Sequence, residues 1–229
     1  MSRKFIVFWF AILAVFVWSG LSTDSLAANQ MPVQVKPTIE HMKVFRQSLY
    51  TNDLDYEETW FNPTTEDWRL DLFSYNPKTP VNGTFLRSIV TEKGYREYVL
   101  KTGNGGLAGG LTGQTWINRE PIKRPFQSLF QDVAKEYKKS EWKSVGTVNL
   151  FGKQVKKSQR LSTDPKGYPL KYIVYLDLST GLPMREEYYF NKDTSPWLVS
   201  TYYFDKVIDP NGTIFKDVSG VTLSEIEAP

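Results

Sequence analysis

Cysteine is absent from the 229-residue chain. Disulfides, thiolate catalysis and thiolate-bound metals are therefore excluded, as is lipid attachment through an N-terminal cysteine. The folded chain must be stabilised by its apolar core alone. About 200 residues suffice for one domain with a sizeable core.

Histidine is nearly absent as well, since His41 is the only one. A Ser-His-Asp triad or a His-rich metal site cannot be built from one histidine, and we expect His41 to be at the surface or partly packed. Residues 103–113, GNGGLAGGLTG, fail the dinucleotide pattern because Ala108 stands in place of its last glycine, and no Lys-Ser/Thr follows. We interpret this stretch as a flexible loop or gate, and we expect neither a cofactor nor a metal.

The net charge of +3 is too small to indicate nucleic-acid binding. Carboxylates are abundant, and a glycosidase needs two that converge. No pair is singled out by spacing, and Glu186 and Glu187 point to opposite faces of a predicted strand. The sequence therefore favours a protein that is not an enzyme, with a secreted carboxylate-dependent hydrolase as the weakest alternative.

The N-terminus has the layout of a secretory signal peptide. Arg3 and Lys4 precede an apolar run over residues 5–18, and Ser25-Leu26-Ala27 fits a small-x-small cleavage site. The run is short for a membrane span, which needs about 20 residues. We expect cleavage of residues 1–27 and a single exported domain over 28–229, periplasmic or secreted, with no stable membrane span. The alternative is an uncleaved N-terminal membrane anchor.

Short aromatic strands follow one another along the chain. Alternating apolar residues over 171–190 predict an antiparallel hairpin with its turn at 179–183. The stretch 37–50 is predicted to be a helix, because its apolar residues form a stripe after Pro37. The other predicted strands are 56–61, 68–75, 84–91, 95–101, 143–155 with its continuation 156–161, and 197–207, and a turn at 209–212 leads into 213–221.

A second helix is predicted over residues 124–139, with Pro125 in its first turn and one continuous apolar face. This helix is either a lid across a hydrophobic groove or a core helix packed on the sheet. The two are compatible if the groove is the concave side of that sheet. The residues expected to bind a hydrophobic ligand are Phe126, Leu129, Phe130, Val133 and Tyr137 on this helix, with Trp68 and Leu70 on a strand.

The stretches LDLSTGLPMREEYYF (176–190) and STYYFDKVIDPNG (200–212) resemble the LolA-like and RseB-like superfamily of extracytoplasmic proteins. In that superfamily a late strand carries an Asp, a T-G-L-P-type turn follows, and a basic residue begins the partner strand. Asp177, residues 180–183 and Arg185 match these features. The resemblance implies a β-rich α+β fold: a strongly curved antiparallel sheet, an unclosed barrel, with helices packed on or plugging its concave face.

The resemblance also implies a kind of function. Members bind the acyl chains of lipoproteins, or sense envelope components and regulate partners. An aromatic content of 15% agrees with an apolar cavity, and equally with a plain aromatic core. We therefore expect an extracytoplasmic carrier or sensor that holds a lipid, an acyl chain or another hydrophobic ligand. The alternative is a cell-envelope regulator or assembly factor that docks another envelope protein without a ligand.

Overall fold

The computed structural model describes residues 38–75, 84–92, 94–101, 111–117, 127–219, 221 and 223–227. The chain divides into two compact units, Met1–Val35 and Lys36–Pro229, and every described residue belongs to the second. The expected signal peptide and the residue Phe126 therefore lie outside the described part of the chain.

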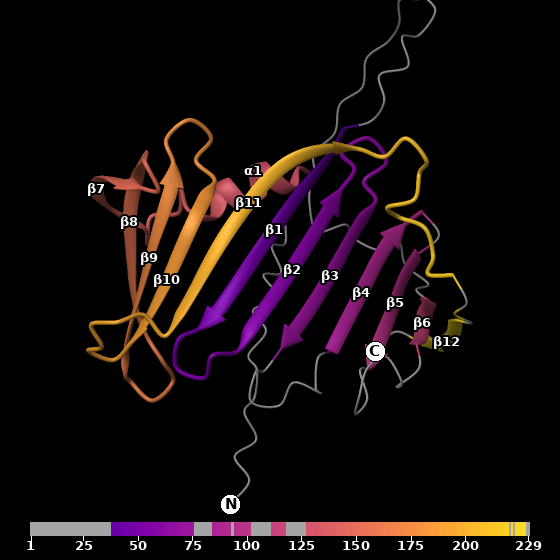
Figure 1. Ribbon diagram of the computed structural model, residues 1–229, viewed down its shortest axis with the longest axis horizontal. Coiled ribbons are helices and arrows are strands. Elements are labelled where there is room, and N and C mark those ends of the chain that lie inside the picture. Colours follow the sequence, from indigo (N-terminus) through magenta and orange to yellow (C-terminus); the bar gives the residue numbers. More distant parts are fainter. Residues whose placement is uncertain are drawn as a thin grey trace, which may run out of the picture. The chain divides into compact units, whose positions relative to one another are not determined.

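Twelve strands form one sheet, in the order β12-β6-β5-β4-β3-β2-β1-β11-β10-β9-β8-β7 (Figure 1). Neighbouring strands pair antiparallel except β12 and β6, which are parallel. The strands are β1 (Thr38–Ser48), β2 (Leu54–Phe61), β3 (Trp68–Tyr75), β4 (Thr84–Thr91), β5 (Gly94–Lys101), β6 (Leu111–Ile117), β7 (Lys143–Leu150), β8 (Lys153–Thr163), β9 (Pro169–Asp177), β10 (Pro183–Phe190), β11 (Leu198–Ile208) and β12 (Leu223–Glu227), and the helix α1 is Leu129–Glu136.

The sheet is curved (Figure 1). It does not close, because β7 and β12 are its two edges and do not pair with each other. Two antiparallel meanders, β1 to β6 and β7 to β11, are joined where β1 pairs with β11 along its whole length. The helix α1 lies against one face of the sheet, which we call the helix face. The predicted β-rich α+β fold with an unclosed sheet and a helix on its concave face is confirmed.

The prediction of a helix over residues 37–50 is wrong, because this stretch forms β1 in the middle of the sheet. Ile39, Glu40, His41 and Met42 are all buried, since both faces of this strand are covered. A strand buried on both faces loses the polar–apolar alternation that identifies strands. Its remaining apolar residues then fell on a spacing that resembled a helical stripe.

Most other predicted strands are confirmed, and the hairpin of β9 and β10 has the expected turn. Gly181 has φ 72° there, and its N–H donates to the carbonyl of Asp177. The stretch expected as one strand from 143 onward is instead the hairpin of β7 and β8, which turns at Phe151 and Gly152. Of the glycine-rich stretch, residues 111–113 begin β6 and the preceding ones lie outside the described part.

The segment 209–219 crosses the face opposite to α1 and connects β11 to the far edge of the sheet (Figure 1). The Tyr98 hydroxyl donates to Asp217 (2.6 Å), and Arg69 donates to the carbonyl of Ile214 (2.9 Å). Tyr98 is fully buried on this opposite face. The part of the final expected segment, 213–221, that the structure describes up to residue 219 is therefore a covering strap and not a strand.

His41 is a buried residue, contrary to the expectation of a surface or partly packed position. It is 5% exposed on the opposite face of β1. Its ring stacks on Trp60, with centroids 4.9 Å apart, and its nitrogens lie 2.7 Å from Asp205 and 3.1 Å from Glu58. The strand, which the sequence pattern missed, places the histidine between carboxylates of its two neighbouring strands.

Candidate ligand-binding site

The helix α1 is fixed to the sheet at its N-terminus. Ser128 is the N-cap and accepts from the N–H of Gln131 (3.3 Å). The carboxylate of Glu40 on β1 accepts from the Ser128 hydroxyl (2.9 Å) and from the N–H of Phe130 (3.1 Å). A buried carboxylate at this position compensates the unpaired N–H groups and the positive end of the helix dipole. The helix therefore begins later than the predicted Pro125 position.

An apolar cluster fills the groove below the first turns of α1. Leu129 is fully buried against Met42, Val44 and Phe61 of β1 and β2. The ring of Phe130 meets that of Phe204 edge-on, with centroids 5.4 Å apart. This end of the groove is a packed core. The partly buried residues around it are Trp68, Phe130, Val133, Tyr202 and Phe204.

The structure thus brings four of the predicted ligand-binding residues together, namely Leu129, Phe130, Val133 and Trp68, in that apolar cluster. Leu70 is half-buried two residues further along β3, on the same face as Trp68. Tyr137 lies beyond the other end of the helix and belongs to a different cluster. Whether these residues contact a ligand stays a prediction.

A polar group lies between the two apolar clusters. Glu186 of β10 accepts from the hydroxyls of Tyr202 (2.9 Å) and Tyr137 (3.4 Å). Burial raises the pKa of Glu186 above its ordinary value, even though both hydroxyls favour the charged form. Burial also raises the pKa of Tyr137 well above its ordinary range. Tyr137, the C-cap of α1, thus meets the sheet through a weak hydrogen bond to a carboxylate and through packing against Val174 and Leu176.

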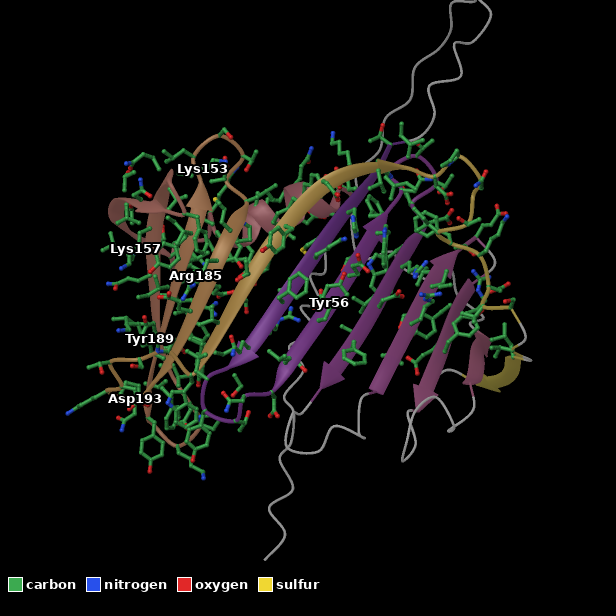
Figure 2. The ribbon with its side chains drawn as sticks, viewed as in Figure 1. Tyr56, Lys153, Lys157, Arg185, Tyr189 and Asp193 are labelled. Carbon is green, nitrogen blue, oxygen red and sulfur yellow. The ribbon has the colours of Figure 1, made fainter. Side chains whose placement is uncertain are left out.

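Glu187, the next residue, lies on the opposite face, as the sequence predicted. It accepts from Arg185 (2.8 Å), Tyr189 (2.9 Å) and Tyr175 (3.1 Å). Figure 2 shows Arg185 and Tyr189 on this part of the sheet. Glu186 and Glu187 therefore do not converge on a common substrate position.

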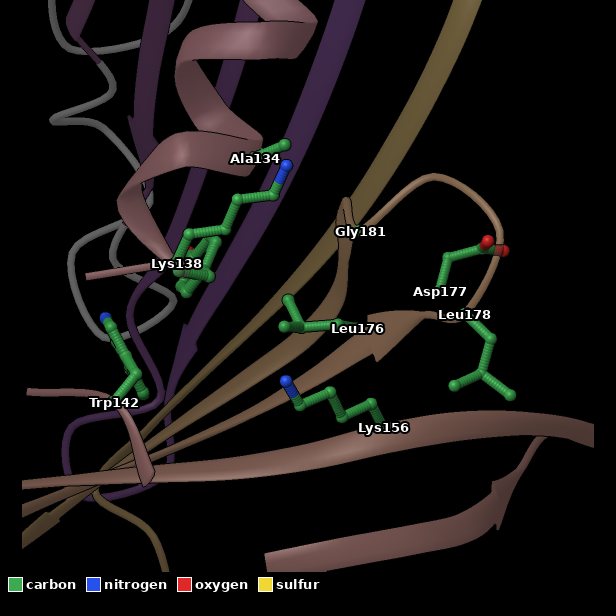
Figure 3. A pocket seen from close by; sticks show the side chains of 9 residues that line it. Ala134, Lys138, Trp142, Lys156, Leu176, Asp177, Leu178 and Gly181 are labelled. Atoms are coloured by element: carbon green, nitrogen blue, oxygen red, sulfur yellow. The ribbon is translucent and has the colours of Figure 1, made fainter. Parts of the chain in front are cut away.

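A pocket of about 300 Å³ opens between the C-terminal end of α1 and the helix face of β8 and β9 (Figure 3). Leu176 and Trp142 are buried at its base and belong to a second apolar cluster with Val174. The ring of Tyr137 lies 5.2 Å from that of Trp142. The lining residues are Ala134, Tyr137, Lys138, Trp142, Lys156, Leu176, Asp177, Leu178 and Gly181.

Asp177 is the acidic member of this lining. Its carboxylate is ion-paired with Lys153, and it accepts from the N–H groups of Ser179 (2.8 Å) and Thr180 (3.0 Å). The hydrogen bonds from Lys153 and from the Ser179 hydroxyl hold the pKa of Asp177 well below its ordinary value. The Asp of the sequence resemblance thus organises the turn between β9 and β10.

Sequence reasoning identified Tyr137 of this pocket and missed most of its lining. Trp142 lies just beyond the predicted helix, whereas Lys156 lies well before the predicted hairpin. Only the pairing of β8 with β9 brings Lys156 opposite Leu176. The apolar stripe of the predicted helix, which ends at Tyr137, is the signal that pointed toward the pocket.

A second, more open hollow of about 320 Å³ lies at the loops that end β1 and β10. Tyr50 stacks on Trp197 there, with centroids 4.8 Å apart. Leu49 and Tyr50 are exposed, and Asp193, Thr194 and Ser195 also line the hollow. This hollow is formed by loop residues, whereas the pocket described above lies against α1.

The described residues contain neither a metal site nor a membrane-spanning helix. No group of three or more His, Asp or Glu side chains among them is arranged to hold a metal ion. Within the same residues, no helix has the length and apolar character needed to cross a membrane.

No protein-family model and no curated protein matches the chain. Similar solved structures include an uncharacterized conserved protein from Thermus thermophilus, with a TM-score of 0.47 and 12% identity over 83% of this chain and 91% of that chain. Another is the MucA/MucB complex of Pseudomonas aeruginosa, with a TM-score of 0.42 and 12% identity over 80% of this chain and 56% of that chain.

A third is a putative outer membrane lipoprotein-sorting protein domain from Vibrio parahaemolyticus, with a TM-score of 0.30 and 10% identity over 76% of this chain and 86% of that chain. Likenesses at this identity concern the fold alone.

Proposed function

We propose that this protein is an extracytoplasmic binding protein, without enzymatic activity, that holds a hydrophobic ligand such as an acyl chain between α1 and the helix face of β8 and β9. The observation that carries the proposal is the pocket of about 300 Å³ beside α1. Leu176, Trp142 and Ala134 supply apolar surface to it. Ligand pockets are concave, mostly apolar and carry a few polar groups, and this volume lies at the lower end of their range.

The way in which α1 is held suggests how a ligand enters. Its first turn is fixed by the fully buried Leu129 and by hydrogen bonds to the Glu40 carboxylate. Tyr137, after its last turn, is only partly buried: it has a 3.4 Å hydrogen bond to Glu186 and packs against the cluster that contains Trp142. We expect the end near Tyr137 to move and the end near Leu129 to stay. A bound chain contributes about 0.8 kcal/mol per buried methylene, which offsets the loss of a few side-chain contacts.

This proposal changes the lid of the sequence interpretation in one respect. The sequence interpretation treated the whole helix as a lid and residues 103–113 as a flexible loop or gate, and of that stretch only residues 111–113 lie in the described part of the chain. The packing of Leu129 against β1 and β2 favours movement of the last turn and of the segment that leads to Trp142.

Titration with a fluorescent fatty acid tests the proposal, with two matched leucine variants. Leu178 is 58% exposed at the pocket, and Leu161 is 69% exposed on the opposite face of the sheet. We expect saturable binding to the native protein, about tenfold weaker binding to Leu178→Gln because an apolar contact worth roughly 1.5 kcal/mol is lost, and unchanged binding to Leu161→Gln. Absence of saturable binding to the native protein would refute the proposal.

A second candidate function, docking of an envelope protein without a ligand, is favoured by the exposed apolar residues at the second hollow. Leu49 and Tyr50 are exposed there beside Trp197. Native mass spectrometry of protein purified without detergent separates the two functions. A co-purified lipid supports ligand binding, and a co-purified polypeptide that is lost on Tyr50→Ser supports docking.

A further inference from the structure

We infer that the pocket beside α1 selects ligands with an anionic head group, a carboxylate or a phosphate on a single apolar chain, and that Lys138, Lys156 and the indole N–H of Trp142 recognise this head group. The inference rests on the proposed function and names the class of ligand that the same pocket takes.

Two lysines line the pocket from opposite sides. Lys138 follows α1, and Lys156 extends from β8 on the helix face (Figure 3). Neither has an ion pair or a side-chain hydrogen bond within the described part of the chain. Their neighbours differ, because Lys135 pairs with Asp132 (2.9 Å), and Lys139 and Lys153 pair with Glu136 and Asp177. The pocket is therefore lined by the cations that the surrounding carboxylates leave unpaired.

Trp142 adds a buried donor to these two cations. The residue is 8% exposed, and its Nε1–H has no acceptor in the part of the chain that the structure describes. A buried N–H without an acceptor is unfavourable, and a ligand oxygen would satisfy it. The guanidinium of Arg160, 5.0 Å from the centre of the indole ring, adds positive potential on this side, although Arg160 also pairs with Glu141 (3.0 Å).

Asp177 does not neutralise the pair of lysines. Its carboxylate points away from both ammonium groups in Figure 3 and is held by Lys153 and the β9–β10 turn. Tyr137, the other titratable group of the lining, has a raised pKa and is uncharged at neutral pH. The charge facing the pocket is therefore positive, which favours an anion there.

The remaining lining defines the rest of the ligand. Ala134, Leu176 and Leu178 are the aliphatic side chains of the same lining. Apolar surface beside two cations and one N–H donor matches a molecule with one charged end and one apolar chain. A volume of about 300 Å³ suits a single short chain.

The test compares three probes with the same chain: decanoate, decyl phosphate and decanol. Their affinities are measured by displacement of an uncharged fluorescent probe from the native protein and from Lys138→Gln, Lys156→Gln and the control Lys135→Gln. We expect both anions to bind the native protein about fivefold more tightly than decanol, the upper value for one partly exposed charge pair. Each pocket variant should reduce this preference without changing the affinity for decanol, and Lys135→Gln should leave it unchanged.

Two contrary results are distinguishable. Equal affinity of the native protein for decanoate, decyl phosphate and decanol would overturn the inference and leave the proposed function standing. A preference for anions that is undiminished in both Lys138→Gln and Lys156→Gln would also overturn the inference and leave the proposed function standing. Failure of all three probes to bind would refute the proposed function and the inference with it. All the substituted lysines are exposed, so the variants are expected to fold.

Discussion

The packing of Leu129 gives the clearest prediction for stability. The side chain is fully buried between α1 and the sheet, in contact with the cluster of Met42, Val44 and Phe61. Leu129→Ala removes three carbon atoms from this cluster and leaves a cavity, because the helix is held by Glu40 and cannot close the gap. Substitutions of this kind lower the free energy of unfolding by about 2–5 kcal/mol. We expect a decrease near the middle of that range, ~3 kcal/mol.

Denaturant titration of the native protein and of the variant measures this loss directly. For a domain of this size the same change lowers the melting temperature by roughly 6–12 °C. Leu178→Ala is the matched control, since Leu178 is exposed, and its effect should stay within about 0.5 kcal/mol. If Leu129→Ala also stayed within that limit, the N-terminal half of α1 would not be packed on the sheet, and the reasoning about a fixed end and a mobile end would fail.

Three further predictions concern the helix anchor, the buried carboxylate and the leader. Glu40→Leu should destabilise by about 1–3 kcal/mol in denaturant titration, because the Ser128 hydroxyl and the N–H of Phe130 lose a charged acceptor; an effect near zero would show that the anchor is dispensable. Burial raises the pKa of Glu186, so the folded state holds its proton more tightly than the unfolded state, and stability should fall as pH rises above about 4.3. Glu186→Gln should remove that part of the decline, and an unchanged pH profile would contradict it. Mass spectrometry of the exported protein should find cleavage after Ala27, whereas a full-length, membrane-bound product would favour the anchor.

Local patterns in the sequence were enough for most of the sheet. The hairpin of β9 and β10 was predictable because its strands alternate and because Gly181 and Pro183 define the turn between them. The strand β1 was not predictable in the same way, because both of its faces are covered and the alternation disappears. The burial of His41 followed from that error, since only a central strand places the ring between Asp205 and Glu58.

The candidate site was predictable only in part. The apolar stripe of the second helix correctly indicated a helix that packs on the sheet, and Leu129 and Val133 do so. The stripe did not indicate where the packing stops and the pocket begins. That boundary depends on Lys156 and Leu176, which come together beside the helix through the pairing of β8 with β9, and no local pattern indicates that pairing.

The most direct test of ligand binding beside α1 is the indole N–H resonance of Trp142 during a titration with decanoate. Trp142 lines the pocket, and Trp60 is buried on the opposite face of the sheet, where its ring stacks on His41. In ¹H–¹⁵N spectra of uniformly labelled protein, the account predicts a saturable shift of the Trp142 resonance and none for Trp60. Saturable binding that leaves the Trp142 resonance in place, or a titration without any saturable change, would contradict it.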